Sequence, residues 1–281
     1  MDKFCDLHIH SHFSDGTCSP AELIALAKSA GLEAIALCDH NSIDGLPDFI
    51  AAAKDSGVEA VPGIEFSTEY EGVELHILGL YIKPQHYEKI GQLMQQLLER
   101  KERSNRHLVA ALNRAGYDVD FESLKASTPN GFVNRALVAA ELTRKGYTES
   151  VKEAFHQLLK PERGYYQPPR RPDAYEIIRF IKEIGAVAVL AHPFLNMDEK
   201  TLRGFLPRAV ECGLDGMEVL YPKYDPETTA LAKEIAREFG ILPSGGSDFH
   251  GENKPDIQIG VGRGNLQIPM SYLEDLCSRR S

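Results

Sequence analysis

Short, continuous apolar runs alternate along the chain with longer stretches in which apolar residues recur at helical spacing. Runs of this length and composition are typical of strands buried on both faces. The pattern predicts seven strands, around residues 4–10, 33–41, 58–67, 73–82, 186–193, 216–222 and 241–250. The first predicted helix opens with the capping-box spelling Ser19-Pro20-Ala21-Glu22. Repeated strand and helix units indicate an α/β fold with a largely parallel sheet and helices outside it.

The alternation stops between residues 84 and 164, where the chain is more polar and mostly helical. Helical spacing there predicts helices at 87–115, 133–145 and 149–160. The segment YYQPPRRP, residues 165–172, cannot continue a helix and marks the return to the main fold. We therefore expect an inserted helical subdomain at 84–164, and a main fold built from 1–83 and 165–281.

Histidines and carboxylates gather where the predicted strands end. His8 and His10 are two apart in the first strand, so strand alternation aims both imidazoles the same way, and Asp15 follows them. The residues at or just past the C-terminal ends of predicted strands are His8, His10, His40, Glu65, His192, Asp248 and His250. His76, inside the fourth predicted strand, is expected to point toward the same site at the ends of the strands. Barrels and open α/β sheets place their active sites at this end.

Many imidazoles with several carboxylates and no obvious thiolate suit zinc, manganese or iron better than calcium or magnesium alone. The candidates are more numerous than the ligands that one ion needs. Two or three divalent ions, bridged by a carboxylate, are therefore expected, and such a cluster can clamp both oxygens of an in-line displacement at phosphorus.

Net charge and cysteine content disfavour several classes of binding partner and structural site. A net charge of -10 over 281 residues disfavours long nucleic acid or an anionic membrane as the main partner, because such binders are usually basic. The five cysteines include no C-x-x-C pair, so neither a disulfide framework nor a zinc ribbon is indicated. A cytoplasmic location is expected, because the first strand begins too early to leave room for a signal peptide.

The segments DLHIHSHFSDGT, ALCDHN, PGIEFS, ELHILGL, AHP and SDFH resemble, in order and spacing, the motifs of the PHP (polymerase and histidinol phosphatase) family of metal-dependent phosphoesterases. The resemblance covers roughly residues 3–83 and 165–262. Within the family, the chain most resembles the branch that includes the 3',5'-nucleoside bisphosphate phosphatases and the related 5'-to-3' exoribonucleases that act on short RNA, and of these it is most similar to the phosphatases. The resemblance implies a distorted (β/α)7 TIM-like barrel with a trinuclear metal site.

The same resemblance implies nine metal ligands: His8, His10, Asp15, His40, Glu65, His76, His192, Asp248 and His250. His12 does not match a ligand position. Asp39 and Glu218 are expected to orient ligand imidazoles. Asp15 or His250 is expected to double as the proton donor to the leaving group.

Cations for a phosphate ester are expected in the insertion. Arg103 and Arg106 lie three apart on the predicted long helix, and Asn134-Arg135 opens a later helix, where free N–H groups can also meet a phosphate. The family has G-R-P-H or a similar motif at that helix, whereas this chain has Leu137 in place of the histidine. Further candidates are Arg163, Arg170, Arg171 and Lys223.

The expected activity is hydrolysis of the 3'-phosphate of nucleoside 3',5'-bisphosphates, such as pAp to AMP and phosphate, by metal-activated hydroxide, with the insertion holding the base and the 5'-phosphate. An exoribonuclease acting on short RNA, and a non-catalytic metal-binding module, are the alternatives. A histidinol-phosphate phosphatase is disfavoured, since the arginine-bearing insertion suits a more anionic ligand. An amidohydrolase is disfavoured, since no predicted strand supplies a bridging lysine.

Overall fold

The computed structural model describes residues 3–128 and 133–280. The chain divides into two compact units. Residues 1–91 and 172–281 form the first, here called the barrel unit, and residues 92–171 form the second, the helical unit. The sequence pattern places the insertion at 84–164; the structure continues the first helix of the insertion out of the barrel unit and keeps the YYQPPRRP segment, up to Arg171, with the helical unit.

The barrel unit is built on an eight-stranded sheet with the order β7-β6-β5-β4-β3-β2-β1-β8. Its strands are β1 (Phe4–Ile9), β2 (Ala34–Leu37), β3 (Glu59–Tyr70), β4 (Val73–Leu80), β5 (Val187–Ala191), β6 (Gly216–Leu220), β7 (Leu242–Gly245) and β8 (Ile268–Pro269). The sheet curls into a nearly closed α/β barrel, because the segment after β7 bonds to the end of β1: Asp248 N donates to His8 O at 2.8 Å. The two-residue β8 is too short for an apolar pattern to predict.

The sheet is less parallel than the strand and helix rhythm predicts. β4 runs antiparallel to both β3 and β5, while β1, β2 and β3, and likewise β5, β6 and β7, are parallel neighbours. Only Glu71 and Gly72 separate β3 from β4, both with positive φ, +49° and +80°. A two-residue turn of this kind joins antiparallel strands, since a parallel crossover needs a dozen residues or more.

Alternate residues of the strands face a common apolar interior. Cys5, Ala36, Leu78 and Val189 belong to one buried cluster although they come from four different strands, as expected inside a curled sheet. Leu273 and its neighbours on the last helix join the same cluster.

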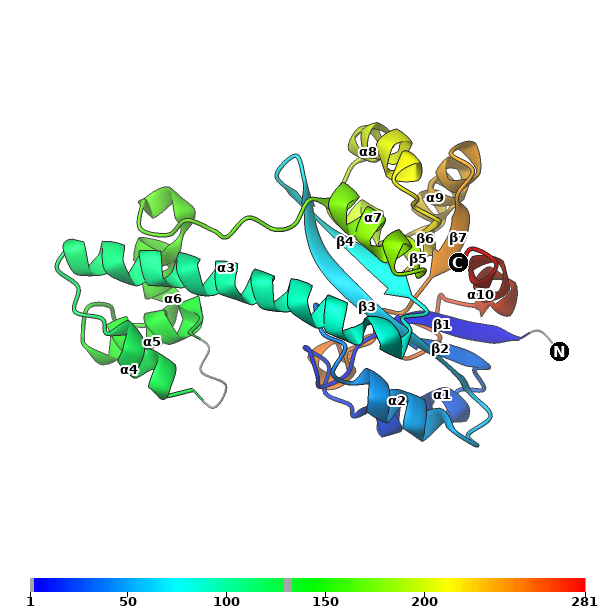
Figure 1. Cartoon of the computed structure of the whole chain (residues 1–281), viewed down its shortest axis with the longest axis horizontal. Coiled ribbons are helices and arrows are strands. Elements are labelled where there is room, and N and C mark those ends of the chain that lie inside the picture. Colours follow the sequence, from blue (N-terminus) through cyan, green and yellow to red (C-terminus); the bar gives the residue numbers. More distant parts are fainter. Residues whose placement is uncertain (1–2, 129–132, 281) are drawn as a thin grey trace. The chain divides into compact units, whose positions relative to one another are not determined.

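Apart from α10, whose residues join the interior cluster, the helices of the barrel unit lie on the outside of the sheet, with α1 and α2 flanking β2 and β3, and α7 and α9 flanking β4 to β7 (Figure 1). The helices of this unit are α1 (Pro20–Ser29), α2 (Leu46–Ala53), α7 (Ala174–Glu183), α8 (Glu199–Glu211), α9 (Pro226–Glu238) and α10 (Met270–Cys277), with short 3-10 turns at Pro84–His86, Pro193–Leu195 and Gly251–Asn253. The predicted capping box is confirmed: Ser19 Oγ accepts from Glu22 N, and the Glu22 carboxylate accepts from Ser19 N.

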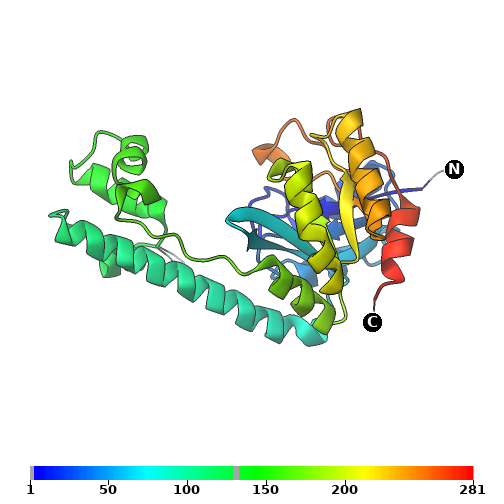
Figure 2. The ribbon, with the colours of Figure 1, turned by 90° about the horizontal axis from the view of Figure 1, so that it is seen from above.

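The helical unit is organised along α3 (Tyr87–Arg114), which starts in the barrel unit, and the chain leaves it as an extended segment (Figure 2). Its other elements are α4 (Phe121–Ala126), α5 (Arg135–Arg144), α6 (Val151–Ala154), a π-helical turn (Phe155–Leu159) and a 3-10 turn (Pro161–Arg163). They enclose a separate apolar cluster that includes Leu112, Val138 and Leu159. None of the helices in the described parts of the chain is both long enough and apolar enough to span a bilayer.

Candidate metal centre

A bulge in β1 aims His8 and His10 into the barrel. Cys5 pairs with Ala34 and belongs to the apolar interior, so in a regular strand His8 would face outward. The register between β1 and β2 shifts by one residue between Asp6 and Ile9, which returns His8 and His10 to the inner face. Both imidazoles are fully buried, and their Nε2 atoms lie 3.0 Å apart. The predicted pairing of these two rings is therefore present, although their facing depends on the bulge.

Glu65 of β3 is fully buried near the centre of the cluster. Its Oε1 lies 2.8 Å from His76 Nδ1 and 3.1 Å from His192 Nε2. His76 pairs with Ser67 on β3 and with Ala191 at the end of β5. Because β4 is antiparallel, its N-terminal half meets the end of the barrel where the neighbouring strands finish.

The second oxygen of Glu65 contacts three more imidazoles. Oε2 lies 3.0 Å from His40 Nδ1, 3.2 Å from His8 Nε2 and 3.3 Å from His10 Nε2. It nevertheless makes no hydrogen bond, because none of these contacts has the required geometry. One buried carboxylate thus bridges imidazoles on both of its oxygens.

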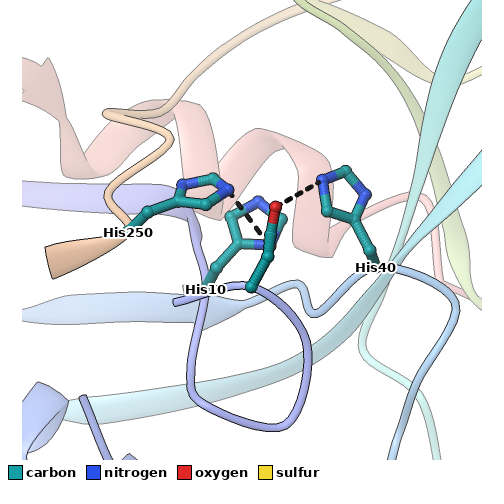
Figure 3. Close-up of side chains that lie close together, drawn as sticks. His10, His40 and His250 are labelled. Atoms are coloured by element: carbon teal, nitrogen blue, oxygen red, sulfur yellow. Dashed lines mark ion pairs between the residues drawn. The ribbon is translucent and has the colours of Figure 1, made fainter. Parts of the chain in front are cut away.

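A second group lies closer to solvent. Potential ligand atoms of His10, Asp15, His40 and His250 all lie within 4.8 Å of one another. Figure 3 shows the three rings of this group turned toward one another. His250 Nε2 is 3.2 Å from Asp15 Oδ1, and His40 Nε2 is 3.8 Å from Asp15 Oδ2. Asp15 has the most exposed side chain of this group, at 55%, and lies at the mouth.

Asp248 connects to both groups. Its Oδ1 lies 3.3 Å from His10 Nε2 and 3.4 Å from His250 Nδ1. Asp248 and His192 both have positive φ, +55° and +26°. Non-glycine residues in such conformations cost about 1–3 kcal/mol and tend to occur at functional sites. At His192 the strain accompanies a second change of facing, since Ala191 before it already belongs to the inner apolar cluster.

Charge in the cluster is balanced between carboxylates and imidazoles. Burial alone would raise the pKa of Glu65, but the charges of His8 and His76 outweigh it and hold that pKa well below its usual range. Burial alone would lower the pKa of His76, and the carboxylate of Glu65 raises it to about 9. Burial lowers the pKa of His250. The buried carboxylates therefore require positive charge nearby, which protons on imidazoles or bound cations supply.

The donor set fits divalent metal ions. Three groups of side chains lie close enough together to hold an ion each. Any two of these groups have one residue in common, which is His10, His40 or Glu65. His10 Nδ1, His40 Nδ1 and Glu65 Oε2 are buried without a hydrogen bond, a state that costs about 1–3 kcal/mol per atom. Imidazole nitrogens and carboxylate oxygens are both common ligands of divalent metal ions, and such an ion would be the partner that these buried atoms lack. The buried clusters are consistent with a site for more than one divalent ion.

Glu218 of β6 orients two of the imidazole-bearing residues, as expected. Its Oε1 lies 3.0 Å from His8 Nδ1, and its Oε2 accepts from His192 N at 2.6 Å. Since an ionised carboxylate only accepts, the contact places a proton on His8 Nδ1 and turns Nε2 toward the cluster.

Asp39 has a different contact from the one expected. It accepts from Ser11 N at 2.8 Å and from Ser14 Oγ at 2.6 Å, and it touches no ligand imidazole among the described residues. It therefore fixes the loop that leads to Asp15. His12, in the same loop, is exposed and lies outside the cluster.

Two contacts of Asp248 were not predicted. Tyr221 Oη and Lys254 Nζ both donate to its Oδ2 at 2.7 Å. Burial and the charge of Asp248 raise the pKa of Tyr221, so the hydroxyl keeps its proton. Tyr221 lies near the C-terminal end of the sixth predicted strand, which is a usable signal, whereas Lys254 lies in a polar loop without one.

Arg103 and Arg106, predicted to share a face of the long helix, have different surroundings. Arg106 Nη1 bonds Glu122 Oε1 at 2.6 Å, its Nη2 bonds Glu102 Oε1 at 2.9 Å, and its guanidinium lies 4.2 Å from the ring centre of Phe121. Arg103 lines a pocket of the helical unit.

Asn134 and Arg135 have structural contacts. Asn134 Oδ1 accepts from Leu137 N at 2.9 Å and caps the start of α5. Arg135 Nη1 donates to Leu159 O at 3.4 Å, and its guanidinium lies 4.4 Å from the ring centre of Tyr166. Their predicted role in substrate binding stays a prediction.

A family model described as the PHP domain matches residues 6–185. The chain is 34% identical to a 5'-3' exoribonuclease of Haemophilus influenzae, over 89% of this chain and 91% of that protein. It is 32% identical to a phosphoribosyl 1,2-cyclic phosphate 1,2-diphosphodiesterase of Eggerthella lenta, over 88% and 94%. It is 28% identical to a 3',5'-nucleoside bisphosphate phosphatase of Chromobacterium violaceum, over 90% of each. The bisphosphate phosphatase, predicted as the most similar kind, is thus less similar than the exoribonuclease.

Among solved structures, the barrel and insertion together match a protein of Bifidobacterium adolescentis described as a metal-dependent phosphoesterase. The TM-score is 0.71 at 26% identity, and the match covers 99% of this chain and 97% of that one.

Proposed function

Because the chain belongs to the PHP family and is therefore a metal-dependent phosphoesterase, we propose that it hydrolyses the phosphate ester at the 3'-oxygen of a small nucleotide, most simply pAp to AMP and phosphate. The observation that supports this proposal most directly is the fully buried Glu65, whose two oxygens contact five imidazoles. This arrangement suits several cations held close together, as needed at a doubly charged phosphoryl group.

The nine predicted ligands would hold two or three ions: His8, His10, Asp15, His40, Glu65, His76, His192, Asp248 and His250. Manganese, zinc or iron matches this donor set. Such ions, when bound, supply charge against the phosphoryl oxygens and make water acidic enough to attack at neutral pH.

The protein's own groups have two further tasks in this proposal, to position the ligands and to move a proton. Glu218 and Tyr221 hold His8 and Asp248 in position. Asp15 and His250, 3.2 Å apart at the mouth, handle the proton. The N–H at His250 Nδ1 donates to Asp248 O at 2.8 Å, which leaves Nε2 as the atom that faces Asp15.

A second candidate is exonucleolytic cleavage of short 5'-phosphorylated RNA. The identity to an exoribonuclease over nine-tenths of both chains favours it. The chemistry is compatible, since removing a 5'-nucleotide from RNA by attack at the phosphorus on O3' breaks the same kind of bond as in pAp. The bisphosphate is then the shortest substrate of a series.

Hydrolysis of pAp, AMP, a 5'-phosphorylated RNA length series and histidinol phosphate by the manganese-loaded protein tests the proposal. Phosphate release from pAp well above the other monoesters supports the bisphosphatase. Release of 5'-nucleotides from RNA at a higher kcat/KM than from pAp favours the exoribonuclease. No turnover of any nucleotide by protein with its full metal content contradicts both.

A further inference from the structure

The helical unit contains a pocket of about 470 Å³ lined by basic side chains. It lies between one face of α3 and the segment that leaves the helical unit. Its basic residues, here called the basic pocket, are Arg100, Arg103, His107 and Arg170.

The basic pocket is formed by one face of α3 and by the segment 167–170, which is hydrogen-bonded to that face. Arg100, Arg103 and His107 are at positions i, i+3 and i+7 of α3 and so share a face. Buried Ser104 Oγ donates to the carbonyl oxygen of Gln167, which holds the segment against this face. Pro168-Pro169 then restrict the backbone that positions Arg170.

The arginines of the basic pocket have no acidic partner among the residues that the structure describes. This differs from neighbouring arginines of the same unit: Arg106 pairs with two glutamates, and Arg144 pairs with Glu141 at 2.7 Å. Unpaired like charges around one pocket repel each other, and the chain as a whole is acidic, at -10. The arrangement is therefore best explained by an anionic ligand.

Guanidinium groups match phosphate oxygens in planar, two-pronged hydrogen bonds. The α3 face from Arg100 to His107 extends over about 10 Å at 1.5 Å per residue, which is more than a single phosphate group needs. We propose that the basic pocket binds successive phosphate groups of a short single-stranded RNA. The choice of RNA rests on the second candidate under the proposed function, cleavage of short RNA, but binding can be measured without turnover.

The test is the binding of a fluorescent 5'-phosphorylated heptaribonucleotide to the full-length protein in EDTA, by anisotropy over a series of salt concentrations. The variant Arg100→Gln/Arg103→Gln/Arg170→Gln should bind more weakly. The slope of log K against log salt should fall by about 2, because each phosphate contact to a single strand contributes about 0.7. Arg144→Gln, which removes a paired charge from the same unit, should leave the slope unchanged.

The turnover arm uses the manganese-loaded enzyme with pAp and with RNA. We expect the triple variant to raise KM for RNA of four or more nucleotides while KM for pAp changes less than twofold. An unchanged salt slope in a folded triple variant overturns the proposal. Equal rises in KM for pAp and RNA overturn it too, since the pocket would then hold the terminal nucleotide. A reduced slope without turnover of any nucleotide supports the pocket and removes the proposed function.

Discussion

Asp248 shows how single residues prepare the metal centre. One of its oxygens faces His10 and His250, while the other accepts hydrogen bonds from Tyr221 and Lys254. The backbone at Asp248 is left-handed, with φ of +55°. Asparagine and aspartate tolerate this conformation better than most residues, so the position constrains both the charge and the backbone.

Asp248→Ala should therefore lose metal and activity together while the barrel still folds. Metal content per chain and phosphate release measure the two effects. Asp248→Asn, which tolerates the same φ, separates loss of charge from backbone strain, and Asp256→Ala, at an exposed aspartate paired with Arg263, is the control. Full turnover with normal metal content in Asp248→Ala would refute the assignment of this ligand.

Tyr221→Phe should leave the ligands in place but remove one of the two hydrogen bonds that hold Asp248 Oδ2. We expect metal affinity or kcat to fall about 10- to 100-fold, the usual effect of removing a group that positions a ligand. Tyr224→Phe is a matched control, since the Tyr224 hydroxyl accepts from Phe194 N at 3.0 Å and does not contact Asp248. Equal effects of the two variants would indicate lost packing instead of lost positioning.

At the scale of elements, the direction of β4 decides whether His76 can reach the cluster. The turn at Glu71-Gly72 reverses the chain after β3, and the register then sets His76 beside Ala191. The turn depends on the positive φ of Gly72, +80°, which side chains other than glycine adopt at a cost.

Gly72→Ala should lower the free energy of unfolding by about 1 kcal/mol, because a Cβ is strained at this φ even though nothing crowds it. Gly91→Ala should change the free energy of unfolding in the opposite direction. Gly91 lies within α3 with open space around its Cα, so alanine there should stabilise by about 0.5–1 kcal/mol. Denaturant unfolding of both variants measures the pair, and the same sign for both would contradict this account of the turn.

At the scale of the whole molecule, the buried cluster links metal binding to the stability of the barrel unit. Residues from β1 to β5 and from the segment after β7 meet at Glu65 and Asp248. Their unpartnered buried atoms lower the stability of the metal-free fold. Ions bound only in the folded state stabilise it by mass action.

Metal at 100 times its Kd should stabilise the barrel by about 2.7 kcal/mol for each ion bound. For a domain of this size, that corresponds to a rise in Tm of about 5–10 °C. Differential scanning calorimetry with manganese and with EDTA measures the shift. The same shift in Asp248→Ala would show that the ions stabilise some other part of the chain.

The donor types, the order along the chain of the strands that bear them and the helical insertion can all be predicted from the sequence, because apolar periodicity and residue chemistry are local properties. The tertiary structure decided which way those donors face. The bulge in β1 and the positive φ at His192 each turn a side chain from the outer to the inner face of the sheet, and the turn at Gly72 reverses the direction of β4. A shift of one residue is enough, because alternate side chains of a strand point to opposite faces.

The partners that organise the site were likewise settled only by folding. Glu218 reaches His8 across the barrel, and Lys254 reaches Asp248 from a polar loop. Arg103 and Arg106 differ because acidic partners are placed around only one of them. Spacing along the chain cannot reveal such contacts, because they depend on which distant segments the closed sheet and the packed helices bring together.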